Sequence, residues 1–97
     1  MAYQYRLTPG AEREFEREIA YSAKHWGKRH AKLYRQGLLE IINSITSNPF
    51  LYPERSEIGA GYRLVRYKGN YIIYRVNESE QYIEIMAFPS AHRSNLN

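Results

Sequence analysis

The chain has 97 residues, 43% of them hydrophobic and 25% charged, which is the balance of a globular protein with room for one hydrophobic core. It has no cysteine, which excludes a disulfide framework and thiolate metal ligands, and no apolar run long enough to cross a membrane. The net charge of +4, from 14 Lys and Arg against 10 Glu, favours an acidic partner, either nucleic acid or protein. We expect residues 1–97 to form a single domain that acts in the cytoplasm, because the first residues do not resemble a secretory signal.

A strand and a helix are the first elements predicted along the chain. Apolar and polar residues alternate over residues 2–7, a period of two that indicates a strand. Thr8 is a good N-cap and Pro9 suits the first helical position, so a helix should begin there and end at Gly27. Its inner face is expected to carry the residues that recur at spacings of three and four, namely Ala11, Phe15, Ile19, Ser22 and Trp26.

A second helix is predicted from about Lys28 to Ser47, and the pair Asn48-Pro49 should stop it. The link between the helices is short, so the two should pack as an antiparallel hairpin. The inner stripe of the second helix is expected to be Ala31, Tyr34, Leu38, Ile41, Ile42 and Ile45.

Three strands are predicted to follow an ordered loop over residues 50–61. They cover about residues 62–67, 71–77 and 82–88, and Pro89 ends the last one. The order β-α-α-β-β-β predicts an α+β fold, with the helical hairpin packed on one face of a small, mostly antiparallel sheet.

The strand at residues 71–77 is apolar on both of its alternating sides. Tyr71 and Ile73 share one side, while Ile72, Tyr74 and Val76 share the other. The helices can cover only one face of the sheet. The second face is therefore expected to be covered by a partner segment, by a curled edge of the sheet or by a second copy of the chain.

Two stretches of the chain are basic. No acid occurs in residues 24–39, and the cationic or titratable side chains there are Lys24, His25, Lys28, Arg29, His30, Lys32 and Arg35. They indicate either a solvated helix face or a contact with phosphate or an acidic protein. In the second stretch, residues 62–76, the members are Arg63, Arg66, Lys68 and Arg75, interleaved with Tyr62, Tyr67, Tyr71 and Tyr74. Arginine beside aromatic rings on a sheet is one way to hold RNA, although strand tyrosines more often reflect packing.

Small-molecule chemistry finds little support in the sequence. His25, His30 and His92 lack the spacing of a metal site, and no glycine-rich nucleotide loop is present, so we expect no metal and no cofactor. His92 could serve as a general acid or base near neutral pH, but a lone histidine in a C-terminal tail is more often simply exposed.

Short motifs spread over almost the whole chain resemble the ParE/RelE superfamily of toxins. In order, they are Leu7-Thr8-Pro9, the helical turn at Gly27, the stop at Asn48-Pro49, Gly61-Tyr62-Arg63, Tyr67, residues 71–76 (YIIYRV), Ile83-Glu84-Ile85 and His92. The resemblance implies a toxin of a type II toxin–antitoxin system that is neutralised in a hetero-oligomer with its cognate antitoxin.

Within that superfamily, the chain is most similar to the ParE branch, whose members act on DNA gyrase without known chemistry of their own. The resemblance places antitoxin contacts at Tyr71, Ile73, Tyr74 and Arg75, and target contacts at Arg63, Arg66, His92 and Arg93. An inhibitor that acts by binding its target needs no catalytic residues.

The alternative is a RelE-type endoribonuclease that cuts messenger RNA in the ribosome. Its candidate catalytic residues are Arg63, Arg66, Arg75 and His92, with Glu54 or Glu57 as a more distant base. Tyr71 stands where ribonucleolytic relatives often have arginine, and Arg93 rather than an aromatic residue follows His92. Both departures favour the gyrase-directed branch. A non-toxic nucleic-acid-binding module remains a third alternative.

Overall fold

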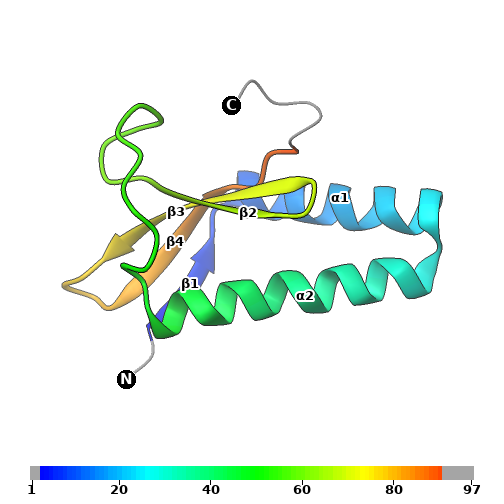
Figure 1. Cartoon of the computed structure of the whole chain (residues 1–97), viewed down its shortest axis with the longest axis horizontal. Helices are drawn as coiled ribbons and strands as arrows, with labels where there is room; N and C mark the ends of the chain where they lie inside the picture. Colours follow the sequence, from blue (N-terminus) through cyan, green and yellow to red (C-terminus); the bar gives the residue numbers. More distant parts are fainter. Residues whose placement is uncertain (1–2, 91–97) are drawn as a thin grey trace.

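A helical hairpin packed on a four-stranded sheet forms the fold of this chain (Figure 1). The structure is a computed structural model, and it describes residues 3–90. Its elements are β1 (Gln4–Leu7), α1 (Pro9–Trp26), α2 (Lys28–Ser47), β2 (Arg63–Tyr67), β3 (Asn70–Asn77) and β4 (Tyr82–Ala87). The predicted order and α+β class are confirmed, and the predicted strand ends differ from the observed ones by one or two residues.

Local signals set the ends of α1 as the sequence predicted. The hydroxyl of Thr8 accepts a hydrogen bond of 3.1 Å from the backbone N–H of Ala11, and Pro9 occupies the first helical position. Gly27 has φ of 96°, a left-handed conformation that favours glycine, and it separates α1 from α2 by a single residue. So short a link forces the two helices to run side by side in opposite directions.

The sheet has the strand order β1-β4-β3-β2, which places the first strand of the chain beside the last. The β2, β3 and β4 strands are antiparallel, whereas β1 runs parallel to β4 with Gln4 opposite Tyr82 and Leu7 opposite Ile85. Mixed pairing of this kind fits the expected mostly antiparallel sheet. None of the helices in the described part of the chain is long and apolar enough to cross a membrane.

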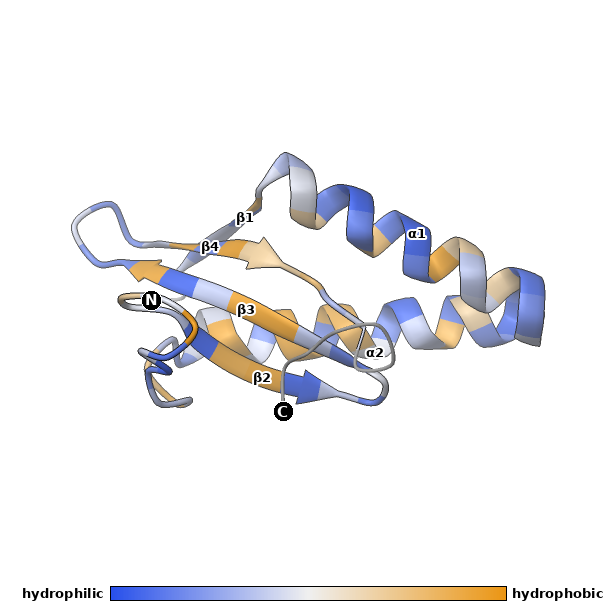
Figure 2. Cartoon of the chain, turned by 90° about the horizontal axis from the view of Figure 1, so that it is seen from above, coloured by the Kyte–Doolittle hydropathy of each residue, from blue (hydrophilic) through white to orange (hydrophobic). Residues whose placement is uncertain are grey.

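The core lies between the hairpin and one face of the sheet. Figure 2 marks in orange the hydrophobic residues along α2, β2 and β3. The buried cluster takes Phe15 from α1, Leu38, Ile42 and Ile45 from α2, and Val65, Ile72, Tyr74, Ile83, Ile85 and Phe88 from the sheet and its last turn. The predicted inner stripe of α2 is therefore the stripe that packs.

Trp26 is an exception, because it was expected on the inner face of α1 but is 68% exposed. It is the last residue of α1, in the part of the hairpin that projects beyond the sheet (Figure 1). Within residues 3–90, no strand covers the ring there. The helical spacing was therefore right, but the helix extends further than the core.

The two apolar sides of β3 have different environments. Ile72 and Tyr74 face the helices and are fully buried. On the other side, Ile73 lies between Leu64 of β2 and Ala87 of β4, where the pairing with β4 is irregular, and it is only 6% exposed. A partner is thus not required to bury Ile73, and among the alternatives left open by the sequence, coverage within the chain accounts for it.

Three tyrosine hydroxyls make hydrogen bonds on the helix-facing side of the sheet. Tyr34 donates to the side-chain oxygen of Asn70, Tyr67 donates to the backbone oxygen of Tyr34 at 3.5 Å, and Tyr74 donates to the backbone oxygen of Pro49 at 3.0 Å. Burial raises the pKa of all three, and it raises the pKa of Tyr74 to about 12.

These tyrosines predict a loss of stability at alkaline pH. Above pH 10, the unfolded chain ionises tyrosines that the folded chain keeps neutral, so each buried group costs about 1.4 kcal/mol of unfolding free energy per pH unit until its own pKa is reached. Urea unfolding at pH 9, 10 and 11 should show this decline. Tyr74→Phe should make the decline shallower, whereas Tyr5→Phe, on an exposed ring, should not. Equal slopes in the two variants would contradict the assignment.

Candidate functional site

The outer face of the sheet, opposite the helices, carries arginine side chains that lie against tyrosine rings. Each pair joins residues from different strands or from a strand and a loop. The distances from guanidinium carbon to ring centre are 3.9 Å for Arg6 and Tyr82, 5.6 Å for Arg75 and Tyr62, and 5.8 Å for Arg66 and Tyr71. Such stacking holds each cation on the surface and leaves its N–H donors at the ring edge for a partner.

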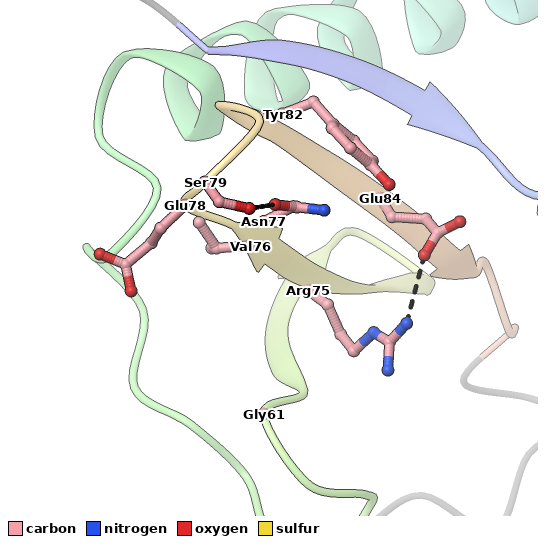
Figure 3. A pocket seen from close by; sticks show the side chains of 8 residues that line it. All are labelled: Gly61, Arg75, Val76, Asn77, Glu78, Ser79, Tyr82 and Glu84. Carbon is pink, nitrogen blue, oxygen red and sulfur yellow. Dashed lines mark hydrogen bonds and ion pairs between the residues drawn. The ribbon is translucent and has the colours of Figure 1, made fainter.

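Arg75 lies at the middle of this face beside a shallow hollow, shown in Figure 3. Its Nη2 is 3.4 Å from Oε1 of Glu84, the residue directly opposite on β4. Both side chains are partly exposed, so the ion pair stabilises the fold only slightly. Its main effect is to orient the guanidinium over the sheet. Asn77 and Tyr82 complete this side of the hollow.

Arg66 lies further along the same face, near the turn between β2 and β3. Its side chain is exposed, and its Nε donates to the backbone oxygen of Lys68 at 3.3 Å. On β3, its cross-strand partner Tyr71 is four residues from Arg75, which separates the two arginines by roughly 13 Å along the strand. The two cations therefore belong to one face without sharing one ligand-sized pocket.

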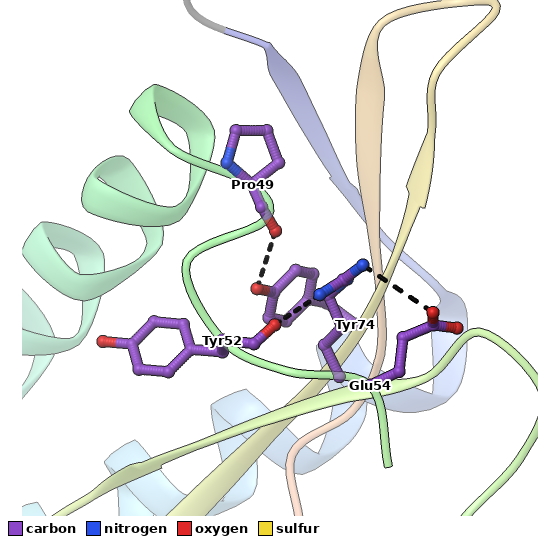
Figure 4. A network of polar contacts seen from close by, with 5 residues as sticks. Pro49, Tyr52, Glu54 and Tyr74 are labelled. Atoms are coloured by element: carbon purple, nitrogen blue, oxygen red, sulfur yellow. Dashed lines mark hydrogen bonds and ion pairs between the residues drawn. The ribbon is translucent and has the colours of Figure 1, made fainter. Parts of the chain in front are cut away.

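Arg63 lies on the other side of the sheet. It is opposite Tyr74 in the register, and its Nη1 donates to the backbone oxygen of Tyr52 in the loop that follows α2. Its Nη2 is 4.0 Å from Glu54, and the side chain is only 14% exposed. Figure 4 shows this network, in which the hydroxyl of Tyr74 also reaches Pro49 of the same loop. Arg63 and Tyr74 thus hold the loop against the sheet.

The structure therefore separates residues that the sequence placed together in the target-binding, antitoxin-binding and candidate catalytic sets. Arg66 and Arg75 share the outer face with the half-buried Tyr71, whereas Arg63 does not join them. Ile73 and Tyr74 are buried in the chain. The two remaining candidates, His92 and Arg93, lie outside the described residues. Within residues 3–90, no three His, Asp or Glu side chains gather closely enough to hold a metal ion.

A family model described as the ParE toxin of type II toxin–antitoxin systems, parDE, matches residues 5–94. The chain belongs to the ParE toxin family. The resemblance drawn from the sequence motifs is thereby confirmed, and the chain is a toxin of a type II toxin–antitoxin system. Curated proteins, by contrast, include none that matches it significantly.

Solved structures of both branches share the fold of this ParE-family toxin. The chromosomal ParDE system of P. aeruginosa matches with a TM-score of 0.76 and 14% identity, over 92% of this chain and 96% of that one. The RelBE2 toxin–antitoxin complex of Mycobacterium tuberculosis matches with a TM-score of 0.66 and 17% identity, over 93% of this chain and 92% of that one. The isolated RelE toxin of E. coli matches with a TM-score of 0.61 and 15% identity, over 98% of this chain and 90% of that one. At these identities, the likeness establishes the fold alone.

Sequence reasoning missed one part of the outer face of this ParE-family toxin. Arg6 and Tyr82 form the closest arginine–tyrosine stack, and Arg6 also lies opposite Glu84 in the register. Alternation within the first strand places Arg6 on the opposite face from Tyr5 and Leu7, so the sequence was enough to assign Arg6 to the outer face. What the sequence did not reveal was that β1 pairs with β4, so the two residues could not be brought together.

Proposed function

We propose that this toxin acts in the cytoplasm as a protein-binding inhibitor of DNA gyrase, and that it is not a ribonuclease. The observation that carries this proposal is the position of Arg63. An RNA-cleaving site needs its cations to converge on one phosphate. Arg63 instead fastens a loop on the opposite side of the sheet from Arg66 and Arg75. What remains outside is an extended surface of cations and rings, which suits a protein partner.

The outer face has the composition of a protein interface. Arginine and tyrosine are among the residue types that most often anchor such interfaces, because they combine a large contact area with directed hydrogen bonds. Arg66 has no acidic side chain paired with it among residues 3–90, so an acidic patch on a target would meet a cation already in place. We assign target binding to Arg66 and, beyond the described residues, to His92 and Arg93.

Antitoxin binding is assigned to the centre of the same face. Arg75 and the half-buried Tyr71 offer the accessible contacts there. Ile73 lies between them on the same side of β3, and Tyr74 lies on the helix-facing side; both act by holding β3 in the sheet, because neither exposes enough surface for a large contact of its own. An antitoxin segment over Arg75 would cover part of the surface that the target needs, which explains how binding could neutralise the toxin.

A supercoiling assay tests this proposal directly. Purified toxin should inhibit gyrase in a dose-dependent way and should leave messenger RNA intact in a ribosome-programmed translation reaction. Full supercoiling activity at saturating toxin would exclude gyrase as the target. Codon-phased cleavage of the message would instead establish the RelE-type alternative. The same preparation serves both reactions, so each provides the control for the other.

A further inference from the structure

The hairpin tip is a second charged surface, and the proposed gyrase binding makes no use of it. We define the tip as residues 21–35, which join the end of α1 to the start of α2. No acid occurs in residues 24–39. The tip projects beyond the sheet (Figure 1), and its exposed cations are Lys24, Lys28, Arg29, Lys32 and Arg35. Arg35 pairs with Glu16 at 3.8 Å, and none of the other four forms an ion pair within the described part of the chain.

Exposed aromatic rings accompany these cations. Trp26 is 68% exposed and Tyr21 is 48% exposed, although both are large enough to stabilise a core if they were buried. Each ring lies against an imidazole: the centroids are 5.9 Å apart for Trp26 and His30, and 4.1 Å apart for Tyr21 and His25. The outward faces of the rings are thus held in defined positions at the surface.

A slot runs from these rings to the turn between β2 and β3. Tyr21 and Trp26 line it from α1, His30 and Tyr34 line it from α2, and Gly69 and Asn70 close it. Polar contacts fix its walls, since Ser22 lies 3.0 Å from Nδ1 of His30 and Tyr34 donates to Asn70. Glu18 also lines the slot and would repel a phosphate there. A flat, uncharged ring fits between the aromatic walls better than an anion does.

We propose that the hairpin tip binds a single-stranded nucleic acid that crosses the tip, with a base stacked on Trp26 on the slot side and phosphates held by Lys28 and Lys32 on the opposite side of α2. These lysines are four residues apart on α2, which places them on one face about 6 Å apart along the axis. Each is two residues from His30, so this face is the side of α2 away from the slot. Stacking on exposed rings beside a cationic track is the usual mode of single-strand binding. Duplex DNA keeps its base faces stacked inside the helix, and an acidic peptide has no bases to stack on Trp26. Neither ligand would therefore use both the exposed ring and the cations. The proposal does not depend on the identity of the toxin's target.

Trp26 is the only tryptophan of the chain, which gives the proposal a direct optical test. Titration of the full-length toxin with an oligothymidylate of about 12 nucleotides at low salt should quench its tryptophan fluorescence. A duplex of the same length and polyglutamate are the comparison ligands. Quenching by the single strand alone supports the proposal. No quenching, or equal quenching by duplex or polyglutamate, overturns it.

A matched pair of double variants tests the role of the lysines. Lys28→Gln with Lys32→Gln should weaken binding of a labelled oligothymidylate at least tenfold, and should lower the slope of log affinity against log salt by about 1.4, roughly 0.7 for each lost phosphate contact. Arg13→Gln with Arg17→Gln removes the same charge at the same spacing from exposed positions of α1 and should leave the slope unchanged. Equal losses in both variants would mean attraction by net charge alone and would refute a site at the tip.

Discussion

Reversing the charge of Arg66 with Arg66→Glu is expected to abolish the growth arrest that the toxin causes in a gyrase-proficient bacterium. Arg66 is exposed on the outer face, and the proposed target contact requires its positive charge. The loss of one anchoring residue from a protein interface typically costs about 2 kcal/mol, which corresponds to roughly 30-fold weaker binding. Repulsion by the new carboxylate adds to that loss. Colony counts after induction, together with supercoiling by gyrase in the presence of the purified variant, measure the effect.

The control for Arg66→Glu is Arg17→Glu, an identical charge reversal at an exposed position of α1. Neither change touches the core, so both variants should unfold within about 0.5 kcal/mol of the parent chain. The Arg17→Glu variant should remain toxic. Toxicity that survives in both variants, or disappears in both, would remove the outer face from the proposed target site.

Replacing Arg63 with alanine should destabilise the fold by about 2 kcal/mol or more. The guanidinium donates to the backbone oxygen of Tyr52, lies 4.0 Å from Glu54 and 5.2 Å from the ring centre of Phe50, and is largely shielded from water. Its removal leaves the carbonyl of Tyr52 without this donor and frees the loop. Urea unfolding measures the loss, and amide hydrogen exchange over residues 50–61 should rise.

Arg66→Ala is the matched control for Arg63→Ala, because it removes the same side chain from the same strand on the opposite face. An exposed arginine of this kind should cost no more than about 0.5 kcal/mol. If Arg63→Ala left stability and loop exchange unchanged but still eliminated toxicity, Arg63 would be a functional contact and the ribonuclease alternative would gain its missing cation.

The helices were predictable because their signals are local. Thr8, Pro9 and Gly27 each act through their own backbone conformation or the nearest N–H groups, so the sequence suffices to locate them. The strands were predictable for a similar reason, since alternation is a property of adjacent residues. Trp26 shows the limit, because its burial depends on how far the sheet extends beneath the helix.

The outer face was predictable only in part. Arg63 and Arg66 are three residues apart on β2, so a period of two places them on opposite faces, and this signal is enough to divide the basic cluster from the sequence alone. The positions of Arg75 and Glu84 relative to them depend on strand register, which pairs residues that are distant in sequence. The contact of Tyr52 with Arg63 depends on the path of a loop, and no pattern in the sequence encodes it.

The pairing of the first strand with the last determines when the toxin can form during its own synthesis. In the described sheet, β1 lies at the edge and its neighbour is β4. The hydroxyl of Thr8, at the end of β1, donates to the carbonyl of Met86, 78 residues later. A nascent chain can form its helical hairpin early, because those contacts are local, but β1 stays unpaired until the ribosome has made β4. A message truncated before residue 82 therefore yields a helical hairpin without a closed sheet, and no toxin.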